Sequence, residues 1–408
     1  MTKCPIIGNP GKKVSYLLPI DGLSTDEEFN NIHSWFARNR GDNPVQFDSI
    51  RNVWNVFQYR DVEAILKDHK NYSMVKSYEA RTPFRSLLNM DPPDHTKMRR
   101  LVSKPFSPRV IEALEPKIKK VSNRLVKEFA SFEEVDIMND YAYPLTITML
   151  TELLGVPAKD KEIFKVWADS TIASPKDDSE EAYKKTTDKI TEMLVKVDEY
   201  LLGVIAERRK DPQEDLISNL IISEIDGELL SDQEILEFSA LLLQAGFGTT
   251  ARLISNAVRC IIETPGLQQQ LRNDPSLLPA AIEEIMRLYS SIYQTIRYAK
   301  VDMVIQGQQI KAGEELSLWI ASANRDELQY ENPDVYNMER GPNHHIAFGK
   351  GVHFCLGASL ARLEVKIALE TLFENTTNVE FRDQVFKPIK SHIANGLEEL
   401  WICLNKKS

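Results

Sequence analysis

The chain has 408 residues, of which 42% are hydrophobic, and its formal net charge is −10. This length and composition allow a large buried core, arranged as one big domain or as two lobes. The acidic balance argues against nucleic acid as a main partner, because phosphate binding requires a basic surface. No apolar run reaches the roughly 18–20 residues of a membrane span, and the first residues lack the apolar segment of a signal peptide. We therefore expect a cytoplasmic protein without a membrane anchor.

Local patterns predict a mainly α fold with small sheets at one side. Apolar residues recur at spacings of three and four across most of the middle of the chain, which is typical of amphipathic helices. The expected helices are 61–68, 110–129, 143–154, 190–209, 232–264 and a last one that begins near Leu356. The expected strands are 45–48, 53–57, 303–306 and 315–320. A polar stretch at 174–181 is interpreted as a surface loop.

Four cysteines are present, and none is spaced for a Cys-x-x-Cys pair. Four in so long a chain make neither a disulfide framework nor a structural zinc site. We interpret Cys260 and Cys403 as small buried hydrophobic residues and Cys4 as part of a frayed terminus. Cys355 differs, because it lies in the decapeptide Phe-Gly-Lys-Gly-Val-His-Phe-Cys-Leu-Gly at 348–357.

Three glycines in this decapeptide, directly before a helical run, predict a tight loop that brings Cys355 to a helix N-terminus. Free backbone N–H groups and the helix dipole favour a thiolate there, and a thiolate can ligate haem iron. A buried structural cysteine in a turn explains the loop chemistry equally well. A nucleophilic cysteine is disfavoured, because His353 is only two residues away and could not easily act as its base.

The decapeptide resembles the haem-binding signature of the cytochrome P450 family. The matching positions are Phe348, Gly349, Gly351, His353, Cys355 and Gly357. The resemblance implies that Cys355 binds the iron of haem b (iron protoporphyrin IX), that His353 contacts a haem propionate and that Phe348 packs beside the sulfur. It also implies the P450 fold, with a helix-rich lobe and a smaller β-containing lobe around a buried haem. We expect one such domain over residues 1–408, with no appended reductase.

Glu284 and Arg287 are three residues apart, so they would meet on one helix face. Such pairs are common and usually solvated. This one resembles the Glu-x-x-Arg pair of the P450 family, and Arg340 matches the arginine that completes it. We expect the three residues to have a structural role near the cysteine loop.

His95 and Arg99 lie four apart after a proline-rich turn, which could be an ordinary exposed helix start. The resemblance makes both donors to a haem propionate, for which arginine is well suited. Arg297 resembles another propionate-binding arginine, although the proline that the family often carries before it is absent here.

The expected helix 232–264 begins with a capping box, formed by Ser231 and Glu234. Its centre, 244–250, reads Gln-Ala-Gly-Phe-Gly-Thr-Thr. Each internal glycine costs roughly 1 kcal/mol relative to alanine, so the glycines indicate close helix packing or a local widening. The stretch resembles the central helix of the family, in which a groove over the iron receives dioxygen.

The family pattern in this helix is Ala-Gly-x-acid-Thr-Thr, and Gly248 stands at the acidic position. Ala245 would lie beside the cofactor, Thr249 would guide oxygen activation, and Gly248 and Thr250 complete the candidate catalytic set. The carboxylate that usually relays protons is missing. A water chain through the gap or a substrate group could replace it, and we favour these over peroxide-driven chemistry because Thr249 is kept. If the relay is limiting, Gly248→Asp should improve the coupling of electrons to product.

The resemblance places an apolar substrate pocket against segments 72–88, 244–248, 291–296 and 394–397. Candidate contacts are Phe84, Leu87, Gln244, Ala245, Ile292, Thr295 and Leu397. Each of them could equally be an ordinary core residue. Fatty acids, terpenoids, steroids and cyclic peptides are all compatible substrates.

Taken together, the motifs predict a haem-thiolate monooxygenase that uses dioxygen and an apolar small molecule. Electrons would come from a separate ferredoxin or flavodoxin with its reductase. Five basic residues could form its dock on the cysteine side, or be ordinary surface charge: Lys97, Arg100, Lys104, Lys350 and Arg362. Two alternatives stay open, namely a peroxide-driven or redox-partner-independent haem-thiolate enzyme, which Gly248 suggests, and a haem sensor without turnover.

Overall fold

The computed structural model describes residues 15–75, 87–129, 131–157, 179–225 and 227–406, together with residues 160, 163, 164, 166 and 175. Helices dominate the described chain, as the sequence predicts. The helices are α1 (Asp26–Asn30), α2 (Ile32–Asp42), α3 (Tyr59–Lys67), α4 (Asp94–Val102), α5 (Pro108–Glu112), α6 (Glu115–Phe129), α7 (Tyr143–Leu154), α9 (Glu180–Lys210), α10 (Leu216–Ile221), α11 (Asp232–Glu263), α12 (Leu267–Asn273), α13 (Leu278–Leu288), α14 (Ile320–Ala323) and α15 (Ala358–Asn375).

The strands form small sheets. The largest has the order β1-β2-β10-β7-β3, and a three-stranded sheet has the order β11-β12-β4. Two hairpins, β5-β6 and β8-β9, complete the set in the described residues. The strand bounds are β1 (Val45–Asp48), β2 (Val53–Val56), β3 (Tyr72–Ser73), β4 (Glu134–Asp136), β5 (Glu224–Ile225), β6 (Glu228–Leu229), β7 (Thr295–Ala299), β8 (Met303–Ile305), β9 (Gln308–Ile310), β10 (Glu315–Leu318), β11 (Thr376–Phe381) and β12 (Trp401–Lys406).

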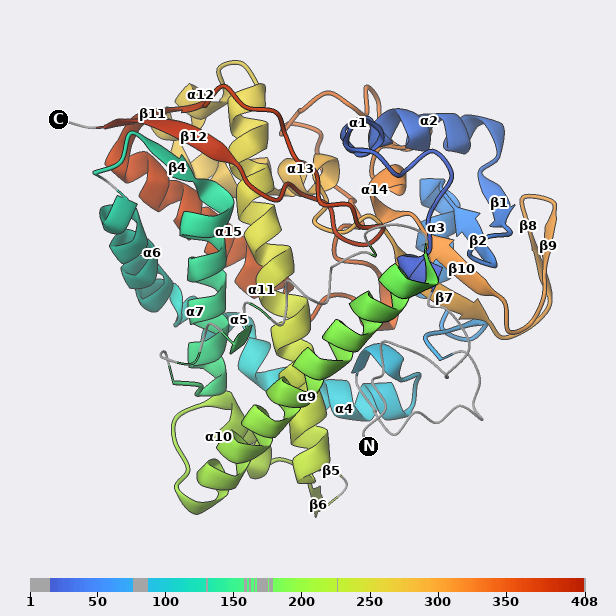
Figure 1. Ribbon diagram of the computed structural model, residues 1–408, viewed down its shortest axis with the longest axis horizontal. Coiled ribbons are helices and arrows are strands. Elements are labelled where there is room, and N and C mark those ends of the chain that lie inside the picture. Colours follow the sequence, from blue (N-terminus) through green and yellow to red (C-terminus); the bar gives the residue numbers. More distant parts are fainter. Residues whose placement is uncertain are drawn as a thin grey trace.

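Helix α11 is the centre of the helical lobe, and it contacts α7, α9 and α15. Figure 1 shows α6, α7 and α15 on one side of it, while α1–α3 and the five-stranded sheet lie on the other side. The main hydrophobic core surrounds α11. A second core lies against the five-stranded sheet, and a third is built on aromatic rings, including stacked Phe57 and Trp319. None of the described helices has the length and apolar character that a membrane span requires.

The largest differences from the expected elements are at three places. The helix expected at 110–129 is two helices, α5 and α6. Pro116, in the first turn of α6, has no N–H to donate to the preceding turn, so α5 does not continue into α6. The strand expected at 315–320 ends at Leu318, before the short helix α14. Helix α9 begins at Glu180, where the Ser179 hydroxyl accepts from the N–H of Ala182, so the last two residues of the loop expected at 174–181 are helical. Residues 174 and 176–178 of that loop lie outside the described residues.

Candidate active site

The cysteine loop leads from the region after α14 into α15, as the decapeptide predicts. The backbone N–H of Cys355 donates to the carbonyl of Phe348 at 2.9 Å, which closes the loop on itself. Gly351 has φ +71° inside a 3-10 turn, and a Cβ there would lie 2.5 Å from the carbonyl oxygen of Leu66. Only glycine satisfies both constraints. The loop is therefore pressed against the end of α3, with the Cys355 side chain half-buried.

Two opposing effects act on the thiol of Cys355. Burial raises its pKa above the ordinary value, while the backbone N–H of Gly357 and the guanidinium groups of Arg99 and Arg362 act in the opposite direction. Burial is the larger effect, so the helix N-terminus does not by itself secure the thiolate that the sequence led us to expect. A cation at the sulfur would supply the missing stabilisation.

Four residues that the resemblance assigns to the haem propionates, from three separate segments, gather at this loop and form a donor cluster. The rings of His95, in α4, and His353 lie 4.3 Å apart. Arg99 donates from Nη2 to the carbonyl of Phe354 at 2.7 Å. Arg297, from β7, is close enough that its charge lowers the pKa of His353. The structure thus brings together His95, Arg99, Arg297 and His353, which the sequence could only propose one at a time.

The pKa values and hydrogen-bond partners in this cluster indicate which ligand it could bind. Burial lowers the pKa of Arg297 to about 10 and that of His353 to about 3. The nearby carboxylate, Asp91, is already bound by the Ser73 hydroxyl at 2.6 Å and by Lys300 at 3.2 Å. His95 Nδ1 is buried and has no hydrogen-bond partner among the described residues. Additional carboxylates would stabilise the charged forms of Arg297 and His353 and would accept a hydrogen bond from His95. The two propionates of haem provide such carboxylates.

The central part of α11 presents Ala245 and Thr249 to accessible space, whereas Gly248 and Thr250 are buried. The Thr249 hydroxyl donates to the carbonyl of Ala245 at 2.7 Å, so its oxygen can still accept a hydrogen bond. At Gly246 a Cβ would lie 2.6 Å from Leu150 Cδ1 of α7. The close helix packing that the glycines suggested is therefore present at Gly246.

A residue that the sequence analysis missed, Arg252, lies beside Gly248. A Cβ at Gly248 would be 3.2 Å from Arg252 Nη1, and a Cβ at Gly396 would be 3.0 Å from Arg252 Cγ. The side chain of Arg252 thus occupies the room left by two glycines, one of them at the family's acidic position. The spacing of four residues, which places Arg252 on the same helix face as Gly248, was the signal available in the sequence.

The candidate substrate contacts divide into two groups. Gln244, Ala245, Ile292 and Thr295 are at least partly exposed, so they could meet a substrate. Leu87 and Leu397 are buried in the main core, with 6% and 1% of their surface exposed. In this structure they pack as core residues, which was the other interpretation of every candidate contact in the sequence. Phe84 lies outside the described residues.

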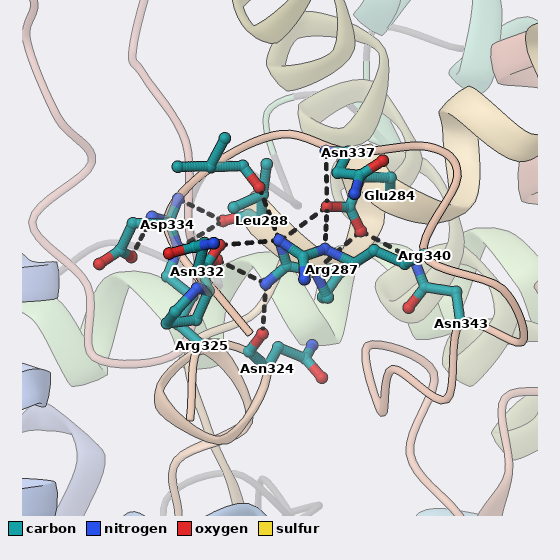
Figure 2. A network of polar contacts seen from close by, with 12 residues as sticks. Glu284, Arg287, Leu288, Asn324, Arg325, Asn332, Asp334, Asn337, Arg340 and Asn343 are labelled. Carbon is teal, nitrogen blue, oxygen red and sulfur yellow. Dashed lines mark hydrogen bonds and ion pairs between the residues drawn. The ribbon is translucent and has the colours of Figure 1, made fainter. Parts of the chain in front are cut away.

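The predicted contact between Glu284 and Arg287 is present and completely buried. Arg287 binds Glu284 through two nitrogens, each at 2.8 Å, and Arg340 Nε binds Glu284 Oε1 at 2.8 Å. Figure 2 shows these side chains converging with Asn337 and Asn343, which also donate to Glu284. Arg287 further donates to the carbonyls of Asn324 and Pro333. The network ties α13 to the long segment that leads into the cysteine loop.

Comparison with known proteins decides the family. Residues 9–394 match the sequence model described as Cytochrome P450. The chain belongs to the cytochrome P450 family. It is 41% identical over 364 residues to a putative cytochrome P450, YjiB, of Bacillus subtilis, covering 89% of this chain and 91% of the relative. It is 37% identical over 344 residues to the erythromycin C-12 hydroxylase of Saccharopolyspora erythraea, covering 83% of this chain and 85% of that enzyme.

The fold is also that of solved P450 structures. The crystal structure of CYP109E1 from Bacillus megaterium in complex with testosterone has a TM-score of 0.88 and 38% identity, covering 94% of this chain and 100% of that one. The chain is thus a P450 monooxygenase whose cofactor is haem. The donor cluster and the cysteine loop described above fit that cofactor in chemistry.

Proposed function

We propose that this P450 inserts one atom of dioxygen into an apolar small molecule of the steroid, terpenoid or fatty-acid type, with Cys355 as the ligand of the haem iron. The observation that carries the proposal is the cysteine loop with its donor cluster. A half-buried thiol lies beside His95, Arg99, Arg297 and His353, and a group that carries both a metal cation and two carboxylates satisfies them together.

Each residue near the cofactor has a definable task in this proposal. Cys355 would bind iron, and the backbone N–H of Gly357 would hold its sulfur in place. Arg297 and His353 would bind the propionates. Bound haem supplies the activation of dioxygen. Ala245 leaves room beside the cofactor, and the acceptor oxygen of Thr249 would orient a water or a substrate hydroxyl through which a proton can move.

Proton delivery must differ from that of relatives with an acid at position 248. The neighbour of Gly248 is Arg252, which cannot release a proton near neutral pH. We propose that water near Thr249 or a polar group of the substrate supplies the protons. Gly248 also keeps a second candidate function open, a peroxide-driven reaction. Product formed with hydrogen peroxide, without any reductant, would favour that second function.

Electrons would be delivered by a separate ferredoxin or flavodoxin with its reductase. Lys97, Arg100 and Lys104 are exposed on and just after α4, while Lys350 is half-buried in the cysteine loop. These charges would attract an acidic partner. Raising the salt concentration should slow reduction by the partner, and a rate that salt leaves unchanged would exclude this dock. Location in the cytoplasm stays a prediction from the sequence.

An optical titration of the ferric protein with a library of apolar compounds tests the function. Substrates that displace water from the iron shift the haem to high spin, and the compounds that do so define the substrate class. The matched variant is Cys355→Ser, which should abolish the thiolate-type spectrum of the ferrous carbon monoxide complex. A thiolate-type spectrum that persists in this variant would show that the ligand assignment is wrong.

A further inference from the structure

A second, half-buried ion pair lies next to the Glu284 network, on the side of the cysteine loop. Arg362, in α15, donates from Nε to Glu283 Oε1 at 2.6 Å and from Nη2 to Glu283 Oε2 at 2.8 Å. His345 Nε2 lies 3.1 Å from Glu283 Oε2. The side chains of Arg362 and Glu283 are about one-third exposed, 35% and 29%. The two adjacent glutamates of α13 therefore serve separate networks, and that of Glu283 reaches α15.

Arg362 is also in contact with the cysteine loop. Its guanidinium carbon lies 4.6 Å from the centre of the Phe348 ring, within the range of a cation–π interaction. The carbonyl of Phe348 accepts the backbone hydrogen bond of Cys355 at 2.9 Å. The guanidinium is thus held beside the residue that accepts the backbone hydrogen bond of Cys355. Because the guanidinium is fixed by two hydrogen bonds and by a ring, its charge has a defined place relative to the sulfur.

We propose that Arg362, held by Glu283, is a positioning residue that weakens electron donation by the Cys355 thiolate and thereby raises the reduction potential of the haem iron. The inference rests on the proposed ligation of iron by Cys355. It assigns Arg362 a different task from the one expected from the sequence, where Arg362 was part of the dock for a redox partner.

The two members of the pair have opposite electrostatic effects. One-electron reduction adds a negative charge at the iron, so a nearby cation favours the reduced state and a nearby anion disfavours it. Arg362→Met should therefore make the iron harder to reduce. Glu283→Gln keeps the size and the hydrogen-bonding oxygen of the side chain but removes its charge, so it should make the iron easier to reduce. A merely structural pair would behave differently, because losing either partner would disturb the loop in the same way.

The test is a potentiometric titration of the haem-loaded protein with small-molecule mediators, which needs no protein partner. For Arg362→Met we expect the reduction equilibrium constant to fall by about tenfold, which is about 59 mV for one electron. For Glu283→Gln we expect a smaller shift in the opposite direction. Arg362→Lys keeps the charge and should stay near the parent value.

The control is Lys366→Met, one turn further along α15. Lys366 pairs with Glu370 at 3.2 Å, and the substitution removes the same charge from the same helix at a different ion pair. Shifts of Arg362→Met and Glu283→Gln in the same direction, or an equal shift for Lys366→Met, would overturn the inference. The carbon monoxide spectrum separates this failure from that of the proposed function. A thiolate-type spectrum in all variants leaves the ligation by Cys355 intact, whereas its absence in the parent protein overturns both.

Discussion

At the scale of single residues, burial and charge decide what the cysteine loop can bind. Burial raises the pKa of Cys355, and it lowers the pKa of Arg297 and of His353. Each shift disfavours the charged form of its group in the protein alone. A ligand that brings a cation to the sulfur and carboxylates to the nitrogens reverses all three effects. Such a ligand would therefore stabilise the charged forms of the loop and the cluster.

The first prediction concerns the retention of haem. Arg297 is 5% exposed, and replacing it by Met removes a buried charged donor. Because hydrogen bonds to charged groups contribute about 1.5–3 kcal/mol, we expect Arg297→Met to lose haem about 10- to 100-fold faster. The measurement is the rate of haem transfer to an excess of a haem-scavenging protein. Arg109→Met, at an exposed arginine in α5, is the control. Equal rates for both variants would mean that Arg297 does not hold a propionate.

The second prediction concerns Gly248→Asp. From the sequence alone, this change should improve coupling if the proton relay is limiting. The structure places Arg252 Nη1 3.2 Å from the new Cβ, so the carboxylate should form an ion pair that lowers its pKa. We expect the yield of product per electron consumed to change by less than about twofold, because a carboxylate paired with a guanidinium is a poor proton donor. A clear rise in yield that is absent in Gly248→Asn would show that the new carboxylate does not pair with Arg252.

At the scale of elements, two helix glycines show separately the effects of helix packing and of helix propensity on stability. Gly246, in α11, faces Leu150 of α7, whereas Gly203, in α9, is exposed, and a methyl group added there would meet nothing within 4 Å among the described residues. Both cost helix stability, but only Gly246 allows two helices to approach closely. The helix stability lost at Gly246 is therefore offset by the closer packing of α7 and α11.

The third prediction is that the same substitution has opposite signs at these two positions. Gly203→Ala should raise the free energy of unfolding by about 0.5–1 kcal/mol, because only helix propensity changes. Gly246→Ala should lower it by about 1–2 kcal/mol, because Leu150 must move in a packed core. Chemical denaturation of the two variants measures both values. Stabilisation by Gly246→Ala would show that α7 and α11 can separate freely.

At the scale of the whole molecule, one buried carboxyl makes stability depend on pH. Glu364, in α15, is 2% exposed, and burial raises its pKa from 4.5 to about 8. The folded state therefore holds a proton that the unfolded chain releases near pH 4.5. The contribution of this group to stability is fully present below the unfolded pKa, and it is lost as the pH rises toward and through about 8.

The fourth prediction follows from this sign. Glu364→Gln should raise the free energy of unfolding at neutral pH by on the order of 3 kcal/mol, because the amide never ionises. Near pH 4.5 the variant and the parent should differ little. Denaturant unfolding at both pH values measures the effect, with exposed Glu112→Gln of α5 as the control. An equal gain at both pH values would show that ionisation of Glu364 is not the cause.

Features that depend on neighbouring residues could be predicted from the sequence. The capping box of Ser231 and Glu234 is present at the start of α11, because its partners are three residues apart. The cysteine loop is similar, since its glycines and Cys355 lie within ten residues. The helix-rich fold followed from periodicity, but some boundaries were wrong, as at Pro116, where the break in the helix depends on one residue. Several elements, among them α2, α12, β11 and β12, were not predicted.

The sequence by itself therefore determined the family, the cysteine loop and most helices, because each is encoded in short-range spacing. Only the tertiary structure decided three further features. These are the pairing of Glu283 with Arg362, the place of Arg252 between two glycines, and the burial of Glu364. Each depends on residues brought together from distant segments or on the depth at which a helix is buried. Those distances and depths arise from the packing of whole helices around α11, which no local pattern in the chain encodes.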